Sequence, residues 1–132
     1  MPLIRVSLRS GKSADYKATL VDTVYTSLRE TFDVPEGDLF ALVHEHAAAD
    51  FLYSPDYLGI ARSDELIVIQ LTVSNTRSQA QKKALYRAIA DGLARRLGVR
   101  PEDVFITLVP ATREDWSFGN GIAQYVAQPQ AA

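Results

Sequence analysis

The chain has 132 residues, of which 47% are hydrophobic, and its formal net charge is -2 at pH 7. Such a chain fits one domain that buries roughly two thirds of its unfolded surface. The balanced charge argues against nucleic acid and anionic membranes as partners, and the absence of cysteine excludes disulfides and thiolate chemistry. No stretch approaches the ~18 apolar residues of a membrane span, and no signal-peptide pattern is present, so we expect a soluble, cytoplasmic protein.

The first half of the chain predicts a strand, a helix and a second strand. Residues 3–8 form an apolar, β-branched-rich run typical of a strand. Ser13 stands where the N-cap of the following helix belongs. That helix is predicted from apolar residues that share one face: Leu20, Val21, Val24, Leu28 and Phe32. "VPEGDLFALV" from Val34 then supplies a turn and the second strand.

The second half repeats this pattern at an offset of about 65 residues. A strand is predicted at residues 66–73, and Ser78 with Gln81 has the spacing of a capping box. The apolar stripe of the second helix comprises Leu85, Ile89, Leu93 and Leu97. "VRPEDVFITLV" from Val99 matches the turn and strand of the first half. We therefore predict an internal duplication, with repeats at about 2–45 and 65–110 and a tail at 111–132.

Two such repeats predict an α+β fold, a duplicated β-α-β two-layer sandwich within a single domain of residues 1–132. Its four-stranded mixed sheet carries both helices on one face. The strands read as apolar along nearly their whole length, which is typical of sheets covered on both faces. No helix remains to cover the second face, so self-association is the simplest cover.

Pro2 directly follows Met1 and precedes the first predicted strand. Proline lacks the N–H that a sheet interior needs, so a purely structural role at a strand start is one interpretation. If Met1 is removed, as is usual ahead of a small residue, Pro2 carries a free secondary amine. Burial lowers the pKa of such an amine and a nearby carboxylate raises it, so the group can serve as a base or as an acid.

Arg77 lies immediately before the predicted N-cap Ser78, where the helix dipole disfavours a cation. This placement indicates a carboxylate site, because an arginine beside free helix N–H groups can bind a carboxylate with two hydrogen bonds. A solvated surface arginine is the alternative. Lys12 holds the equivalent position in the first repeat, and its role is open. His44 and His46 share a strand face, but without an evident third ligand we expect no metal site.

The N-terminal proline and the duplicated β-α-β pattern occur together with two further motifs, "GIARSDELIVIQLT" from Gly59 and "EDWSFGNGIAQY" from Glu114. In combination they resemble the tautomerase superfamily, and within it the malonate semialdehyde decarboxylase family. The resemblance extends to about Ala127. It implies a homotrimer of duplicated units that uses the amine of Pro2 and needs no cofactor.

The resemblance also implies roles for individual residues. Asp38 matches the catalytic aspartate that lies near the proline amine, although Asp103 occupies the same place in the second repeat, and turn capping would explain both carboxylates. Arg77 matches one of two arginines that bind the substrate carboxylate. At the position of the other arginine this chain has Ser74 or Asn75.

Three aromatic residues of the tail match an apolar wall of the family's site: Trp116, Phe118 and Tyr125. Aromatic residues in a tail are also common packing or interface anchors, and that interpretation stays open.

The function implied by the resemblance is a lyase that decarboxylates a small 3-oxo acid such as malonate semialdehyde, with hydratase side activity. Pro2, Asp38 and Arg77 would be its catalytic residues, and a small carboxylate-bearing molecule its substrate. One alternative is a keto–enol tautomerase, in which neutral Pro2 moves a proton of a 2-oxo acid. Another is a non-enzymatic small-ligand-binding domain, in which Pro2 only opens a strand. The pKa of the proline amine separates the two enzymes, because a value well above neutrality favours the lyase.

Overall fold

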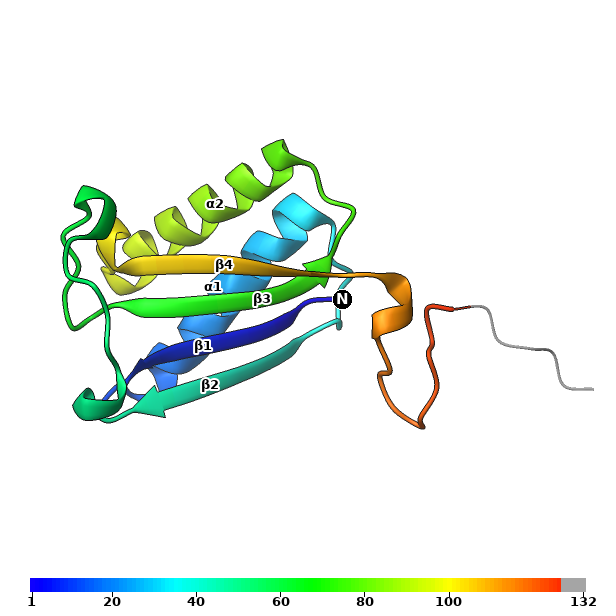
Figure 1. Cartoon of the computed structure of the whole chain (residues 1–132), viewed down its shortest axis with the longest axis horizontal. Coiled ribbons are helices and arrows are strands. Elements are labelled where there is room, and N and C mark those ends of the chain that lie inside the picture. Colours follow the sequence, from blue (N-terminus) through cyan, green and yellow to red (C-terminus); the bar gives the residue numbers. More distant parts are fainter. Residues whose placement is uncertain (127–132) are drawn as a thin grey trace, which may run out of the picture.

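The structure is a computed structural model, and it describes residues 1–126. A four-stranded sheet forms one layer and two helices form the other (Figure 1). The elements are β1 (Leu3–Arg9), α1 (Ala14–Phe32), β2 (Phe40–His46), β3 (Ile67–Ser74), α2 (Gln79–Leu97) and β4 (Val104–Ala111). Among the described residues, no helix is both long and apolar enough to cross a bilayer. Residues 127–132 of the predicted tail lie outside the described part.

The sheet confirms the predicted topology of two joined β-α-β repeats. Its strand order is β2-β1-β3-β4, with β1 parallel to β2 and β3 parallel to β4. The two repeats meet at the centre, where β1 and β3 run antiparallel. Both helices lie on one face of this mixed sheet (Figure 1).

Both helices begin at the predicted caps. The Ser13 hydroxyl accepts a hydrogen bond from the Tyr16 N–H at 3.0 Å, and Ser78 forms a complete capping box with Gln81. The two helices also end alike, since Asp33 and Gly98 each adopt a left-handed backbone conformation, with φ of 55° and 67°. The duplication seen in the sequence therefore extends to the conformation of the helix ends.

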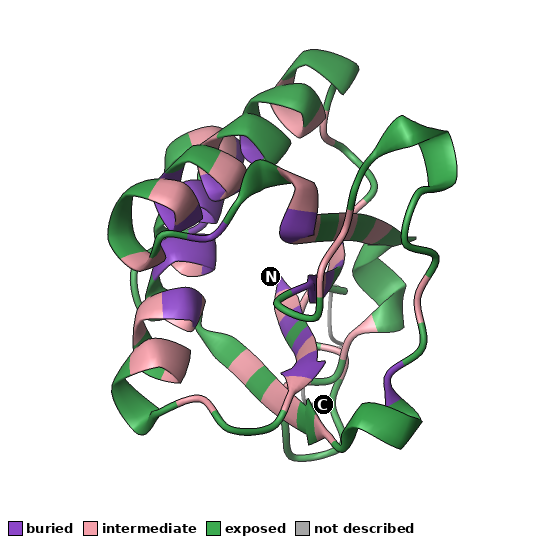
Figure 2. Ribbon diagram, turned by 90° about the vertical axis from the view of Figure 1, so that its left-hand side faces the viewer, coloured by how far each residue is buried: buried purple, intermediate pink, exposed green. Residues whose placement is uncertain are grey.

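The core lies between the sheet and the helices, and buried residues gather on the helix sides that face the sheet (Figure 2). Fully buried side chains come from β1, β3 and both helices: Ile4, Val6, Leu20, Val24, Leu28, Ile67, Ile69, Leu71, Leu85, Ile89 and Leu93. The two helices pack against each other at Gly92, where a Cβ atom would lie 2.7 Å from the Thr23 methyl group. Glycine at this position permits the close approach of α1 and α2.

The second face of the sheet is uncovered in the single chain, and it is less uniformly apolar than the sequence suggested. Large apolar side chains are exposed on β2 and β4: Phe40, Leu42, Phe105 and Val109. The strands between them place Arg5 and Gln70 on the same face, opposite each other in the register of β1 and β3. The expectation of nearly continuous apolar strands is thus met only in part.

One edge of the sheet collects four chain segments that are far apart in the sequence. Leu3, which begins β1, is paired with Phe40, which begins β2, and with Thr72 near the end of β3. The last residue of β3, Ser74, pairs with Ala111, the last residue of β4. The residues before β1 and β2 therefore lie beside the residues that follow β3 and β4.

Candidate active site

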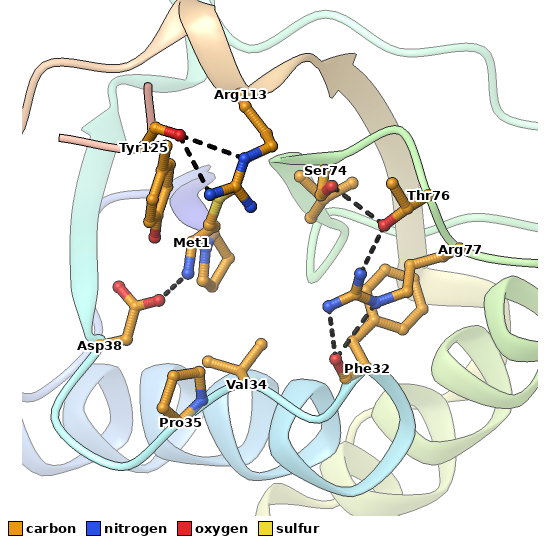
Figure 3. Close-up of a pocket in the computed structure, with 12 residues that line it drawn as sticks. Met1, Phe32, Val34, Pro35, Asp38, Ser74, Thr76, Arg77, Arg113 and Tyr125 are labelled. Carbon is orange, nitrogen blue, oxygen red and sulfur yellow. Dashed lines mark hydrogen bonds and ion pairs between the residues drawn. The ribbon is translucent and has the colours of Figure 1, made fainter. Parts of the chain in front are cut away.

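A cavity of about 270 Å³ opens at this edge (Figure 3). It is lined by Pro2 and Met1 before β1, by Asp38 before β2, by Arg77 after β3, and by Arg113 and Tyr125 after β4. The three predicted catalytic residues and one predicted wall residue therefore share one cavity.

The start of the chain supplies an amine to this cavity. The α-amino group of Met1 forms an ion pair with the Asp38 carboxylate, and Pro2 behind it is buried. Partial burial, and then the positive charge of Arg77, lower the pKa of this amine from 8.0 to about 6. The amine therefore loses its proton more readily than a solvent-exposed chain terminus.

The turn that carries Asp38 is fastened to α1. The Tyr25 hydroxyl donates to the Pro35 carbonyl at 3.2 Å and accepts from the Gly37 N–H at 3.0 Å. The Asp38 N–H donates to the same Pro35 carbonyl at 3.3 Å. These bonds fix the carboxylate in front of the amine before any ligand enters.

Arg77 is held by the C-terminal end of α1. Its Nε and Nη2 donate to the Phe32 carbonyl at 3.1 and 2.6 Å, and its Nη1 donates to the Thr76 hydroxyl at 2.8 Å. Phe32 is the last residue of α1, where carbonyls lack partners within the helix. Within residues 1–126 no carboxylate lies within ion-pair distance of Arg77. Its charge remains available to an anion in the cavity.

Of the three aromatic residues predicted as a wall, Tyr125 lines the cavity, whereas Trp116 and Phe118 do not. The Phe118 ring meets Tyr125 edge-on at 4.9 Å, and Trp116 stacks on Phe118 at 5.4 Å. Phe118 also contacts Phe40 of β2, with 6.1 Å between the ring centroids. In the single chain, Trp116 and Phe118 thus support Tyr125 from behind.

Arg113 lines the cavity and was missed by the sequence analysis. It begins a short 3-10 helix, Arg113–Asp115, that directly follows β4. The duplicated topology offers a signal for it, because β3 and β4 are parallel and both end at this edge. Any residue just after β4 is therefore brought near the residues that follow β3.

Ser74 and Asn75, which stand at the position of the family's other arginine, and Lys12, whose role the sequence leaves open, lie in different places. Ser74 lines the cavity, and its hydroxyl lies 3.0 Å from that of Thr76, whereas Asn75 is absent from the lining. Lys12 lies at the opposite edge of the sheet, where it forms an ion pair with Glu65. Lys12 therefore does not contribute to this cavity in the single chain.

The described part of the chain contains no cluster of three or more side chains able to hold a metal ion. His44 and His46 do share a face, as predicted, in a separate hollow on the open side of the sheet. The guanidinium-bearing Arg5 lines the same hollow.

Two family models, both described as tautomerase enzyme, match residues 2–61 and 38–119. The probable tautomerase YusQ of Bacillus subtilis (strain 168) is 46% identical over 126 residues, which cover 96% of this chain and 99% of YusQ.

Solved structures show the same relationship. FG41 malonate semialdehyde decarboxylase inhibited by 3-bromopropiolate aligns with a TM-score of 0.87 and 33% identity, covering 96% of this chain and 99% of that one. A second malonate semialdehyde decarboxylase, described as having decarboxylase and hydratase activities, gives 0.86 and 29%, covering 93% and 95%. A fused 4-OT symmetric trimer shares the fold at 0.74 and 22%, covering 91% and 94%. The chain therefore belongs to the tautomerase superfamily of enzymes.

Proposed function

We propose that this chain, once Met1 is removed, is a cofactor-independent decarboxylase of a small 3-oxo acid such as malonate semialdehyde. One observation carries the proposal: an N-terminal amine, a carboxylate and a guanidinium without a carboxylate partner within residues 1–126 line the same small cavity. Removal of Met1 would transfer the free amine to Pro2, next to Asp38 and Arg77. The similarity to two malonate semialdehyde decarboxylases over nearly the whole chain supports the same reaction.

In this proposal Arg77 binds the substrate carboxylate, and protonated Pro2 polarises the 3-oxo group through a hydrogen bond. In the covalent form of the same step, neutral Pro2 attacks the 3-oxo carbon, the carbonyl oxygen leaves as water to give an iminium, and water hydrolyses the iminium after carbon dioxide has left. The bond between the carboxylate carbon and the adjacent carbon breaks, and its electron pair becomes the double bond of an enolate. Carbon dioxide leaves, and a proton added at carbon gives the aldehyde. Asp38 holds Pro2 in place and favours its charged form. The same groups can direct water onto an activated unsaturated acid, which is the hydratase side activity.

A second candidate is a keto–enol tautomerase of a 2-oxo acid, and one observation favours it. Burial and Arg77 lower the pKa of the Met1 amine to about 6, and the same surroundings would act on the amine of Pro2. A neutral amine at pH 7 is a base that can take a proton from carbon and return it elsewhere. The name of YusQ points in the same direction. The matches to tautomerase enzymes disfavour the third alternative, a non-enzymatic ligand-binding domain.

We also propose that the enzyme is a homotrimer. The open face of the sheet supports this assembly, because Phe40, Leu42 and Phe105 are between 45% and 50% exposed in the single chain. Burying such side chains against other copies would remove apolar surface from water. The fused 4-OT trimer has the same fold.

The test is an assay of the purified protein with 3-oxopropanoate and with phenylenolpyruvate, after mass spectrometry has verified that Met1 is absent. We expect carbon dioxide and acetaldehyde from the first substrate, and a loss of activity on the order of 100-fold or more in Pro2→Ala. Activity on phenylenolpyruvate alone would favour the tautomerase, and activity on neither would contradict both candidates. Titration of the isotope-labelled Pro2 amine by NMR gives the pKa that distinguishes a charged acid from a neutral base.

A further inference from the structure

Arg113 is a second guanidinium in the cavity and, within residues 1–126, it also lacks a carboxylate partner. Its Nε and Nη2 donate to the backbone carbonyl of Tyr125 at 3.2 and 3.0 Å, and its guanidinium lies 5.3 Å from the centre of the Tyr125 ring. A neutral carbonyl fixes the side chain without cancelling its charge. Nη1 has no hydrogen-bond acceptor within residues 1–126.

The two arginines approach the cavity from different sides. Arg77 comes from the segment between β3 and α2, together with Ser74 and Thr76, whereas Arg113 comes from the segment after β4 and points toward Met1 (Figure 3). The carboxylate of Asp38 is already paired with the amine. An occupant of the cavity therefore meets one guanidinium at the Arg77 side and another at the amine side.

We propose that Arg113 is a catalytic residue that binds the oxygen on which negative charge develops, while Arg77 binds the substrate carboxylate. This inference deepens the proposed function but does not depend on which of the two reactions occurs. When a 3-oxo acid loses carbon dioxide, the electron pair of the broken C–C bond moves toward the carbonyl oxygen. When a 2-oxo acid loses a proton from carbon, the electron pair of the C–H bond moves the same way. Each reaction thus creates an enolate oxygen in addition to a carboxylate.

A prearranged cation beside that oxygen stabilises the transition state more than the ground state, because the ground state carries no charge there. Partial burial and Arg77 lower the pKa of the Met1 amine to about 6, so an amine at this place is not a permanent cation. Arg113 keeps its charge at every working pH. It also supplies a second cation in a chain that has Ser74 or Asn75 at the position of the family's other arginine.

The test uses malonate and propanoate as probes, because malonate carries a second negative oxygen group where the enolate would form and propanoate does not. Binding is measured by NMR titration or calorimetry with the protein lacking Met1. We expect Arg113→Gln to weaken malonate binding about tenfold or more and to leave propanoate binding within about twofold. Arg77→Gln should weaken both. Unchanged malonate binding in Arg113→Gln, or an equal loss for both probes, would overturn the proposal.

Two further variants keep this test independent of folding and of net charge. Arg87→Gln removes one positive charge from an exposed position of α2, whose side chain is 79% exposed, and should change neither affinity. Arg113→Lys retains a cation and should bind malonate several-fold more tightly than Arg113→Gln. Equal affinities in these two Arg113 variants would show that the charge is not what binds the probe, and so would contradict the proposal.

Kinetics separate the two arginines if the enzyme turns over either substrate. Arg113→Gln should mainly lower kcat, because its contact forms as charge develops, whereas Arg77→Gln should mainly raise KM. Loss through KM alone in Arg113→Gln would contradict the catalytic role. If neither substrate reacts, the proposed function fails, while the malonate and propanoate affinities still decide the role of Arg113.

Discussion

The two repeats place an aspartate at the same point, just before their second strands, but in different surroundings. Asp38 lies beside the start of the chain and forms an ion pair with its amine at the wall of the cavity. Asp103 is 1% exposed and accepts two hydrogen bonds of 2.7 Å from the N–H and the hydroxyl of Ser63. The first strand of the second repeat, β3, is preceded by more chain instead of a terminus. Ser63 of that preceding segment supplies the hydrogen bonds to the Asp103 carboxylate.

The arginine and lysine before the two helices differ in a similar way. Arg77 donates hydrogen bonds to the Phe32 carbonyl and has no carboxylate partner within residues 1–126, whereas Lys12 forms an ion pair with Glu65. One end of the sheet therefore combines the amine and Asp38 of the first repeat with Arg77 of the second. At the other end, the equivalent Lys12 and Asp103 form internal contacts. Equivalent positions of a duplicated unit can thus stabilise the fold at one end of the sheet and form a candidate active site at the other.

The largest expected difference is between Asp38→Ala and Asp103→Ala. We expect Asp38→Ala to lower kcat/KM on the order of 100-fold while changing the free energy of unfolding by less than about 1 kcal/mol, because its ion pair is partly exposed. Asp103→Ala should leave the half-buried Ser63 N–H without its partner and cost about 1–3 kcal/mol. Steady-state kinetics and urea unfolding measure the two effects. The comparison fails if both variants lose mainly activity or both lose mainly stability.

A smaller contrast is expected between Arg77→Gln and Lys12→Gln. Removing Arg77 takes a positive charge away from the amine, so the pKa of the amine should rise, and KM should increase about tenfold. Lys12→Gln should leave the kinetics unchanged and alter stability by less than about 1 kcal/mol, as is usual for an exposed ion pair. NMR titration and kinetics check these outcomes. A loss of activity in Lys12→Gln would show that the opposite end of the sheet also takes part in catalysis.

A dependence of stability on pH is expected for protein that retains Met1. Its amine has a pKa of about 6 when folded and 8.0 when exposed, so between these values the unfolded chain binds more protons than the folded one. The free energy of unfolding should therefore rise as the pH increases from 6 to 8. Chemical denaturation across this range measures the slope, and an N-acetylated sample should lack this contribution. A fall in stability over the same range would instead indicate that Asp38 dominates and raises the pKa.

Much of this architecture follows from local patterns in the sequence. The caps at Ser13 and Ser78 and the repeated apolar stripes specify two equivalent helices, and the pairing of β1 with β3 then joins the repeats. Arg77 was accessible to the same reasoning, because a cation just before a helix start needs an anion or an acceptor. Its acceptors include Phe32, at the end of the other helix.

The tail was harder to predict because its arrangement depends on contacts within its own loop. The Gln124 side chain accepts from the Phe118 N–H at 2.8 Å and donates to the Gly119 carbonyl at 2.7 Å, which folds the segment back on itself. This fold directs Tyr125 to the cavity and leaves Trp116 behind Phe118. Arg113 becomes part of the site through the same arrangement, which no periodic pattern encodes.

The bond from Arg77 to the last carbonyl of α1 has a mechanical consequence. The Arg77 guanidinium lines the cavity and, through its hydrogen bonds to Phe32, also links the end of α1 to the start of α2. An anion that binds Arg77 adds to the restraint on this joint, so occupancy of the cavity should slow amide hydrogen exchange in the last turn of α1 and the first turn of α2. Amide hydrogen exchange in the helical layer would then show whether the cavity is occupied. The helices lie on the other side of the core from the open face of the sheet.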